Sequence, residues 1–96
     1  MKILYTRGMV LIALYRQNSE QARPVYEFLE MLKRRYPGRP IVELDIDTRE
    51  GAAEASLYDV VRYPALLVRS LDGRIQGMWE GEPLPLIDEV AGLLLE

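Results

Sequence analysis

The fold is decided by the stretch Tyr58-Asp59-Val60-Val61-Arg62-Tyr63-Pro64-Ala65-Leu66-Leu67-Val68. Within it, the pair Tyr63-Pro64 stands directly before a run of small and aliphatic residues. Proline has no backbone N–H to donate to a neighbouring strand, so within sheets it is found at the first residue of a strand or at an edge. The stretch therefore predicts a buried strand over Ala65–Ser70, entered through a turn at Tyr63-Pro64.

Downstream of this strand, the dipeptide Asp72-Gly73 is a strong hairpin signal that predicts φ > 0 at both turn positions. The hairpin leads to a second strand over Arg74–Glu80. Pro83 and Pro85 then open a helix, because proline suits the first helical turn. The apolar face of this helix is predicted to contain Leu84, Ile87, Val90, Ala91 and Leu94.

Upstream, Met9–Tyr15 is continuously apolar, which is typical of a strand buried on both faces. The polar run Arg16–Ser19 ends it, and either Asn18 or Ser19 is placed to cap a helix, with Asn18 and Gln21 spaced as a capping box. The helix that follows ends at Pro37-Gly38. Apolar residues recur along it at three- and four-residue spacing, at Ala22, Val25, Tyr26, Leu29, Leu32 and Tyr36.

Between these two parts, Ile41–Ile46 predicts a further strand, and Thr48 is placed to cap a short helix that runs to Tyr58. The first β-α-β connection is expected to be right-handed and parallel. An additional strand over Ile3–Thr6 is an open alternative. The sequence therefore predicts one α/β domain over residues 1–96, a mixed four- or five-stranded sheet with helices on both faces.

These patterns resemble the thioredoxin-like family over nearly the whole stretch from Met9 to Leu95. Tyr63-Pro64-Ala65 is the most specific match, because in that family a cis-proline turn opens a core strand opposite the redox turn. The resemblance implies a thioredoxin-like fold with a cis Tyr63–Pro64 bond. It places the two family cysteines on Ser19 and Ala22, or on Arg16 and Ser19 if Pro24 sets the register.

The chain contains no cysteine, so the degenerate redox motif Ser19-Glu20-Gln21-Ala22 has no thiolate to offer. In the first register, the aspartate and lysine that handle protons in the family fall on Ala13 and Glu43. The resemblance therefore implies a redox-inactive member. A sequence in which Ser19 or Ala22 has replaced an original cysteine is the alternative.

The composition narrows the function classes further. With no histidine, the chain lacks the commonest metal ligand and general base, so we expect no catalytic residue, metal site or cofactor. Asp45 and Asp47 are interpreted as caps after the second strand rather than as a metal pair. A net charge of −3 argues against a nucleic-acid or membrane partner, and without a long apolar segment we expect a cytoplasmic protein.

The remaining candidates concern binding. In the family, the turn that corresponds to Tyr63-Pro64 presents its backbone to an extended segment, and here we expect it to do so without chemistry. Tyr15, Arg16 and Trp79 are candidates for flanking contacts. The alternatives are a glutathione-dependent or other non-dithiol enzyme, a small chaperone or assembly factor, and a weak homodimer through the edge strand Arg74–Glu80.

Overall fold

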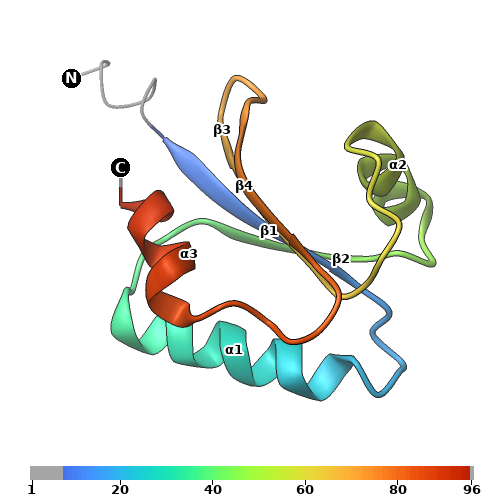
Figure 1. Cartoon of the computed structure of the whole chain (residues 1–96), viewed down its shortest axis with the longest axis horizontal. Helices are drawn as coiled ribbons and strands as arrows, with labels where there is room; N and C mark the ends of the chain where they lie inside the picture. The colour runs from blue at the N-terminus through green and yellow to red at the C-terminus, as the bar shows by residue number, and fades with distance from the viewer. Residues whose placement is uncertain (1–7, 96) are drawn as a thin grey trace.

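One four-stranded mixed sheet organises the computed structural model, which describes residues 8–95 (Figure 1). The strand order is β2-β1-β3-β4, in which β1 pairs parallel with β2 and antiparallel with β3, and β3 pairs antiparallel with β4. The predicted strand at Ile3–Thr6 lies outside the described residues. In chain order the elements are β1 (Met9–Tyr15), α1 (Ala22–Arg35), β2 (Ile41–Asp45), α2 (Arg49–Leu57), β3 (Ala65–Ser70), β4 (Ile75–Glu80) and α3 (Ile87–Leu94).

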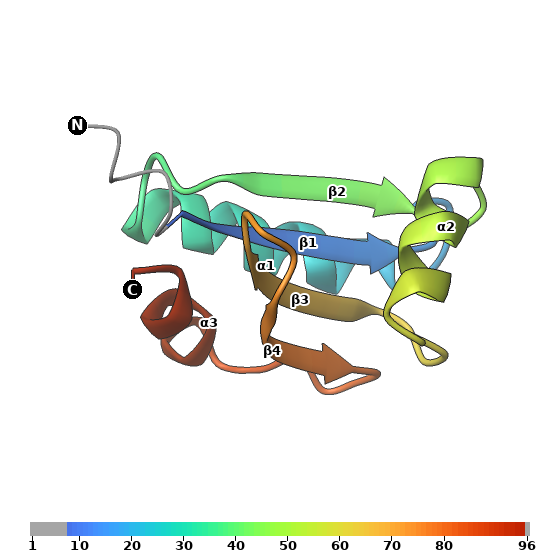
Figure 2. The same cartoon turned by 90° about the horizontal axis from the view of Figure 1, so that it is seen from above.

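Helices cover both faces of the sheet, as the sequence predicts. Helices α1 and α3 lie on one face, and α2 lies at the end of the other (Figures 1 and 2). Alternate residues of β1 point to opposite faces, so Leu11 and Ala13 pack toward α1 and α3, whereas Ile12 and Leu14 pack toward α2. This two-sided burial explains why β1 is apolar at every position.

The two faces carry unequal cores. Helix α1 contributes Val25, Phe28, Leu29 and Leu32 to the first core, and α3 adds Val90, Ala91 and Leu94. On the other face, α2 contributes only the small side chain of Ala55 to the buried cluster. An ion pair from Glu54 on α2 to Arg69 on β3, with Oε2 and Nε 3.7 Å apart, also ties this helix to the sheet. None of the helices in residues 8–95 is long and apolar enough to span a bilayer.

The buried face of α1 matches the predicted stripe except at one position. The predicted residues Val25, Leu29 and Leu32 are buried, whereas Tyr26 is 59% exposed. Phe28, which the prediction left out, is buried instead. Tyr26 and Phe28 lie on opposite sides of the row formed by the other three residues, so periodicity alone does not choose between them.

The start of α1 also differs from the prediction. The N-cap residue is Gln21, and no side chain caps the helix, so the predicted capping box of Asn18 and Gln21 is wrong. Ser19 instead stabilises the preceding turn, because its Oγ donates to the Arg16 carbonyl (2.6 Å) and accepts from the Gln21 amide (3.2 Å). The predicted cap of α2 is confirmed, since Thr48 Oγ1 accepts from the Gly51 amide at 3.0 Å.

Two boundaries near the C-terminus are corrected as well. In the hairpin, Gly73 has a φ of 96° but Asp72 does not have a positive φ, and the Ser70 amide donates to the Arg74 carbonyl at 2.9 Å. The connection is therefore longer than a two-residue turn, and β4 begins at Ile75. Helix α3 begins at Ile87 rather than at the prolines, because the residues before it are extended, as Leu86 shows with a ψ of 147°.

Candidate functional site

The turn before α1 and the turn before β3 meet at one hydrogen bond. The side-chain amide of Gln21 donates from Nε2 to the Tyr63 carbonyl oxygen at 3.2 Å, although the two residues are 42 positions apart. The Tyr63–Pro64 and Glu82–Pro83 peptide bonds are both cis, and Pro64 is fully buried. The degenerate motif Ser19-Glu20-Gln21-Ala22 and the Tyr63-Pro64 turn thus lie side by side.

Glu80, the last residue of β4, holds the Tyr63 turn from the other side. Its Oε1 accepts from the backbone amides of Val61 and Arg62, both at 3.2 Å. The Tyr63 hydroxyl donates to the Val60 carbonyl at 3.1 Å, which fixes the side chain against its own turn. These bonds satisfy backbone groups that neither a helix nor a strand would satisfy, and they fix the backbone of the turn.

Gly81 brings the following segment against the same turn. Its amide donates to the Pro64 carbonyl at 2.8 Å, and its φ of 77° suits glycine. A Cβ at this position would lie 2.8 Å from an Arg62 guanidinium nitrogen. Beyond Gly81 the surface is hollowed, and the hollow, of about 540 Å³, is lined by Pro24, Glu82, Pro83 and Leu84.

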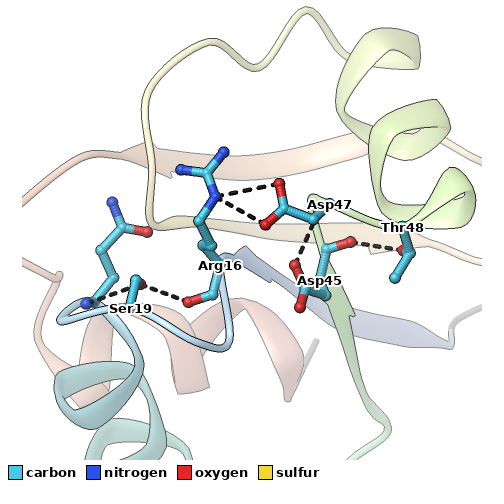
Figure 3. Close-up of polar contacts among 6 residues, drawn as sticks. Arg16, Ser19, Asp45, Asp47 and Thr48 are labelled. Atoms are coloured by element: carbon cyan, nitrogen blue, oxygen red, sulfur yellow. Dashed lines mark hydrogen bonds and ion pairs between the residues drawn. The ribbon is translucent and has the colours of Figure 1, made fainter.

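Arg16 lies beside this site, but its guanidinium is already paired with the Asp47 carboxylate (Figure 3). Its Nε contacts both carboxylate oxygens of Asp47, at 3.0 and 3.2 Å, and this hydrogen bond raises the pKa of the guanidinium. Asp45 Oδ1 accepts from the Asp47 amide at 2.9 Å, and the Asp45 carbonyl accepts from Thr48 Oγ1 at 2.6 Å. The helix cap is therefore Thr48 and not either aspartate. Within residues 8–95 no cluster of three or more acidic side chains is arranged to hold a metal ion.

Tyr15 does not offer the aromatic contact expected of it. Its side chain is only 5% exposed and belongs to the core beneath α1. The hydroxyl donates to Glu43 Oε1 at 2.8 Å, and burial, followed by this carboxylate, raises the pKa of Tyr15 to about 12. Only the edge of the residue reaches the surface, in a separate hollow of about 540 Å³ lined by Tyr15, Gln17, Ala22, Arg23, Tyr26, Glu27 and Glu43.

Trp79 also differs from the expectation. It pairs with Leu66 in the sheet and packs, half-buried, against the core on the α1 and α3 face. A Cβ on Gly77 would lie 3.0 Å from the Trp79 ring, so the ring extends over Gly77 and away from the Tyr63 turn. Its neighbour on β4, Met78, is exposed on the opposite face of the sheet.

Sequence reasoning named Gln21 only as a position of the degenerate motif and of a capping box, and it did not name Glu80 as a site residue. For Glu80 a signal was available, because a hairpin at Asp72-Gly73 places the end of β4 beside the start of β3. For Gln21 the local sequence gives no comparable signal, since a glutamine near a helix start is most simply interpreted as part of a cap.

Comparison with known proteins supports the fold alone. No family model matches the sequence, and a search of curated proteins finds no match. Among solved structures, a thioredoxin from Fasciola hepatica has a TM-score of 0.70 at 17% identity, covering 97% of this chain and 84% of its own. A thioredoxin variant from Halobacterium salinarum has a TM-score of 0.70 at 22% identity, with 97% and 77% covered. A structure described as a malarial protein has a TM-score of 0.71 at 11% identity, with 92% and 94% covered. The chain thus has a thioredoxin-like fold, without the cysteines of the redox motif.

Proposed function

We propose that this domain binds an extended protein segment across the Tyr63-Pro64 turn, without thiol–disulfide chemistry. The observation that supports the proposal is that hydrogen bonds fix the turn on both sides of Tyr63. Glu80 binds the two amides before Tyr63, and Gly81 binds the carbonyl of Pro64 after it. A backbone fixed on both sides is pre-organised for strand-like pairing, because it loses little conformational freedom on binding.

The groups available at Tyr63 suit main-chain recognition. Its carbonyl carries only a side-chain amide as partner, and its own amide has no hydrogen-bond acceptor among residues 8–95. An extended segment gains affinity from such backbone groups and specificity from pockets that take alternate side chains. The hollow beside Gly81 is lined by three apolar residues, Pro24, Pro83 and Leu84, together with Glu82, and we expect it to take one apolar side chain of that segment.

The absence of cysteine and histidine from the sequence favours binding over catalysis. Without a thiol the site has no nucleophile of the kind that a disulfide exchange needs, and without histidine it has no ordinary general base. The net charge of −3 favours a protein segment over a nucleic acid or an anionic membrane as the partner. The proposed role is therefore that of a binding or adaptor domain.

Backbone chemical-shift mapping tests the proposal, with peptides selected from a random display library on the wild-type domain. We expect the amides of Gln21, Tyr63 and Gly81 to shift on titration. Leu84→Asp places a charge in the apolar hollow and should abolish binding. Leu86→Asp is the matched control, because Leu86 is 71% exposed and lies two residues further along the chain.

Two other outcomes would contradict the proposal. Shifts confined to residues 74–80 would indicate pairing along the β4 edge, and self-association of the free domain through those residues would identify a homodimer. A saturable shift of Ser19 and Tyr63 with glutathione, together with turnover of a glutathione-dependent substrate, would instead favour the enzyme alternative.

A further inference from the structure

We propose that the Gln21 side chain occupies the Tyr63 carbonyl by a hydrogen bond in the free domain and rotates away when a segment binds there. This inference rests on the proposed function and adds the residue that controls it. The Nε2–O distance of 3.2 Å means that one lone pair of the Tyr63 carbonyl is already occupied, so an incoming backbone N–H competes with Gln21 for this oxygen. Only the nitrogen of the amide can donate to a carbonyl, which fixes the orientation of the Gln21 side chain.

In this closed arrangement, the hydrogen bond from Gln21 to the Tyr63 carbonyl contributes little net stability. Oε1 of the same amide is buried and has no hydrogen-bond partner within residues 8–95. An unpaired buried acceptor costs about as much free energy as one intramolecular hydrogen bond contributes. Rotation of the side chain into water would hydrate both ends of the amide, so a ligand that replaces the donor on Tyr63 displaces Gln21 at little cost.

The backbone of Gln21 does not need to move in this exchange. Its amide donates to Ser19 Oγ at 3.2 Å, and its carbonyl accepts from the Val25 amide at 3.4 Å. Its φ of −70° and ψ of −22° already belong to the helix that it begins. Opening is therefore a side-chain rotation on a fixed helix start, which is fast compared with loop rearrangements.

The exchange also defines the chemistry of the segment that binds. The residue facing Tyr63 must supply a backbone N–H to replace the Gln21 donor. Proline and N-methylated residues cannot supply it, so with such a segment Gln21 stays on the Tyr63 carbonyl and the segment gains no hydrogen bond at that position. Gln21 thus acts as a gate that selects a main-chain donor at one position of the segment.

A tethering experiment tests this gate, because the chain has no cysteine of its own. Ser19→Cys provides a single thiol beside the turn. The probe is a capped Ala-Ala-Cys-Ala-Ala peptide, together with four copies that are each N-methylated at one alanine. The measured quantity is the equilibrium constant for the mixed disulfide, in competition with mercaptoethanol. Gln21→Ala and Gln21→Met are added to this background, the second to keep the side-chain volume without an amide.

We expect both Gln21 variants to raise the equilibrium constant for the unmethylated probe roughly 2-fold, because a closed state about as stable as the open one leaves only part of the molecules free to bind. The peptide methylated at the facing residue should gain nothing from either variant. Gln76→Ala, which removes an exposed glutamine of β4, is the control and should leave every constant unchanged. In the Ser19→Cys protein, the side-chain amide resonances of Gln21 should shift toward those of a solvent-exposed glutamine once the probe is bound.

The other outcomes separate the gate from the proposed function. If the probe binds and neither Gln21 variant changes its constant, the gate is wrong and the binding site stands. If the Gln21 variants lower the constant, Gln21 contacts the ligand and does not exclude it, which also overturns the gate. If no probe binds above a glycine-capped cysteine control in any variant, both the gate and the proposed function fail.

Discussion

Ala13 and Glu43 lie directly opposite each other in the parallel pairing of β1 with β2. When the degenerate motif is aligned on Ser19 and Ala22, the resemblance to the thioredoxin-like family implies a proton-handling aspartate and lysine at these two positions. Here one position holds a methyl group, and the other holds a carboxylate that accepts a hydrogen bond from Tyr15 at 2.8 Å. In that alignment the chain has neither the thiols nor the two groups that would support them.

A first prediction follows for Ser19→Cys/Ala22→Cys. The Ala22 amide donates to the Ser19 carbonyl at 3.1 Å, so the two positions lie in one turn and a disulfide should form between the new thiols. We expect thiol titration to show its formation. Insulin reduction by this variant should nevertheless stay far below that of a thioredoxin, since Ala13 and Glu43 supply no proton relay. Activity of the wild-type chain, or high activity of the variant, would contradict this account.

Tyr15 gives a prediction about alkaline pH. Its pKa is raised to about 12 by burial and by Glu43, whereas the pKa of an unfolded tyrosine is about 10. The neutral phenol therefore contributes stability that is fully present below about pH 10 and is lost as the pH rises through about 12. Over this window the wild-type free energy of unfolding should fall by roughly 1–3 kcal/mol more than that of Tyr15→Phe.

Denaturant unfolding across this pH range measures the difference. Tyr26→Phe is the matched control, because Tyr26 is 59% exposed and its replacement should leave the wild-type pH dependence in place. Equal pH dependence of the wild type and Tyr15→Phe would mean that Tyr15 titrates at its ordinary pKa.

The neighbouring aromatic residues of α1 should respond differently to truncation. Phe28 is 8% exposed within the core, so Phe28→Ala should lower the free energy of unfolding by about 3–5 kcal/mol. Tyr26→Ala removes an exposed ring and should change it by about 0.5 kcal/mol or less. Urea unfolding of both variants measures the two changes. A larger loss of unfolding free energy for Tyr26→Ala would mean that Tyr26 belongs to the buried face, as predicted from the sequence.

Two helical glycines provide a further matched test. A Cβ on Gly51 of α2 would collide with the backbone carbonyl of Asp45, whereas nothing lies within 4 Å of a Cβ on Gly92 of α3. We expect Gly92→Ala to stabilise the domain by up to about 1 kcal/mol through helix propensity. Gly51→Ala should destabilise it by roughly 1–3 kcal/mol, because backbone atoms must shift. Thermal unfolding of the pair should therefore move in opposite directions.

The two central strands were predictable because burial on both faces leaves a continuous apolar run. Ala65–Ser70 and Met9–Tyr15 match their predicted bounds, since Pro64 precedes the first and polar residues from Arg16 onward follow the second. The start of α3 was not predictable in the same way. Pro83 and Pro85 fit a first helical turn and an extended segment equally well, and only the packing of the chain after Gly81 decides between them.

The candidate site was predictable as a meeting of segments but not as a set of contacts. The resemblance brought Ser19-Glu20-Gln21-Ala22 and Tyr63-Pro64 together. The hydrogen bond between Gln21 and Tyr63 joins positions that are distant in the sequence, so no local pattern encodes it. The same holds for the burial of Tyr15, because its aromatic ring suits either a core or an exposed contact, and the helix above it determines which.

The unequal cores on the two faces of the sheet make the domain uneven in its resistance to local unfolding. Helix α2 is anchored by Ala55 and by the ion pair of Glu54 with Arg69, so we expect its amides to exchange with deuterium earlier than those of α1. Val60 and Tyr63 belong to the same weaker core. A brief opening of α2 would therefore uncover Val60 and Tyr63 while the opposite face stays protected, so that the rigidity of the Tyr63 turn depends on the less stable face of the sheet.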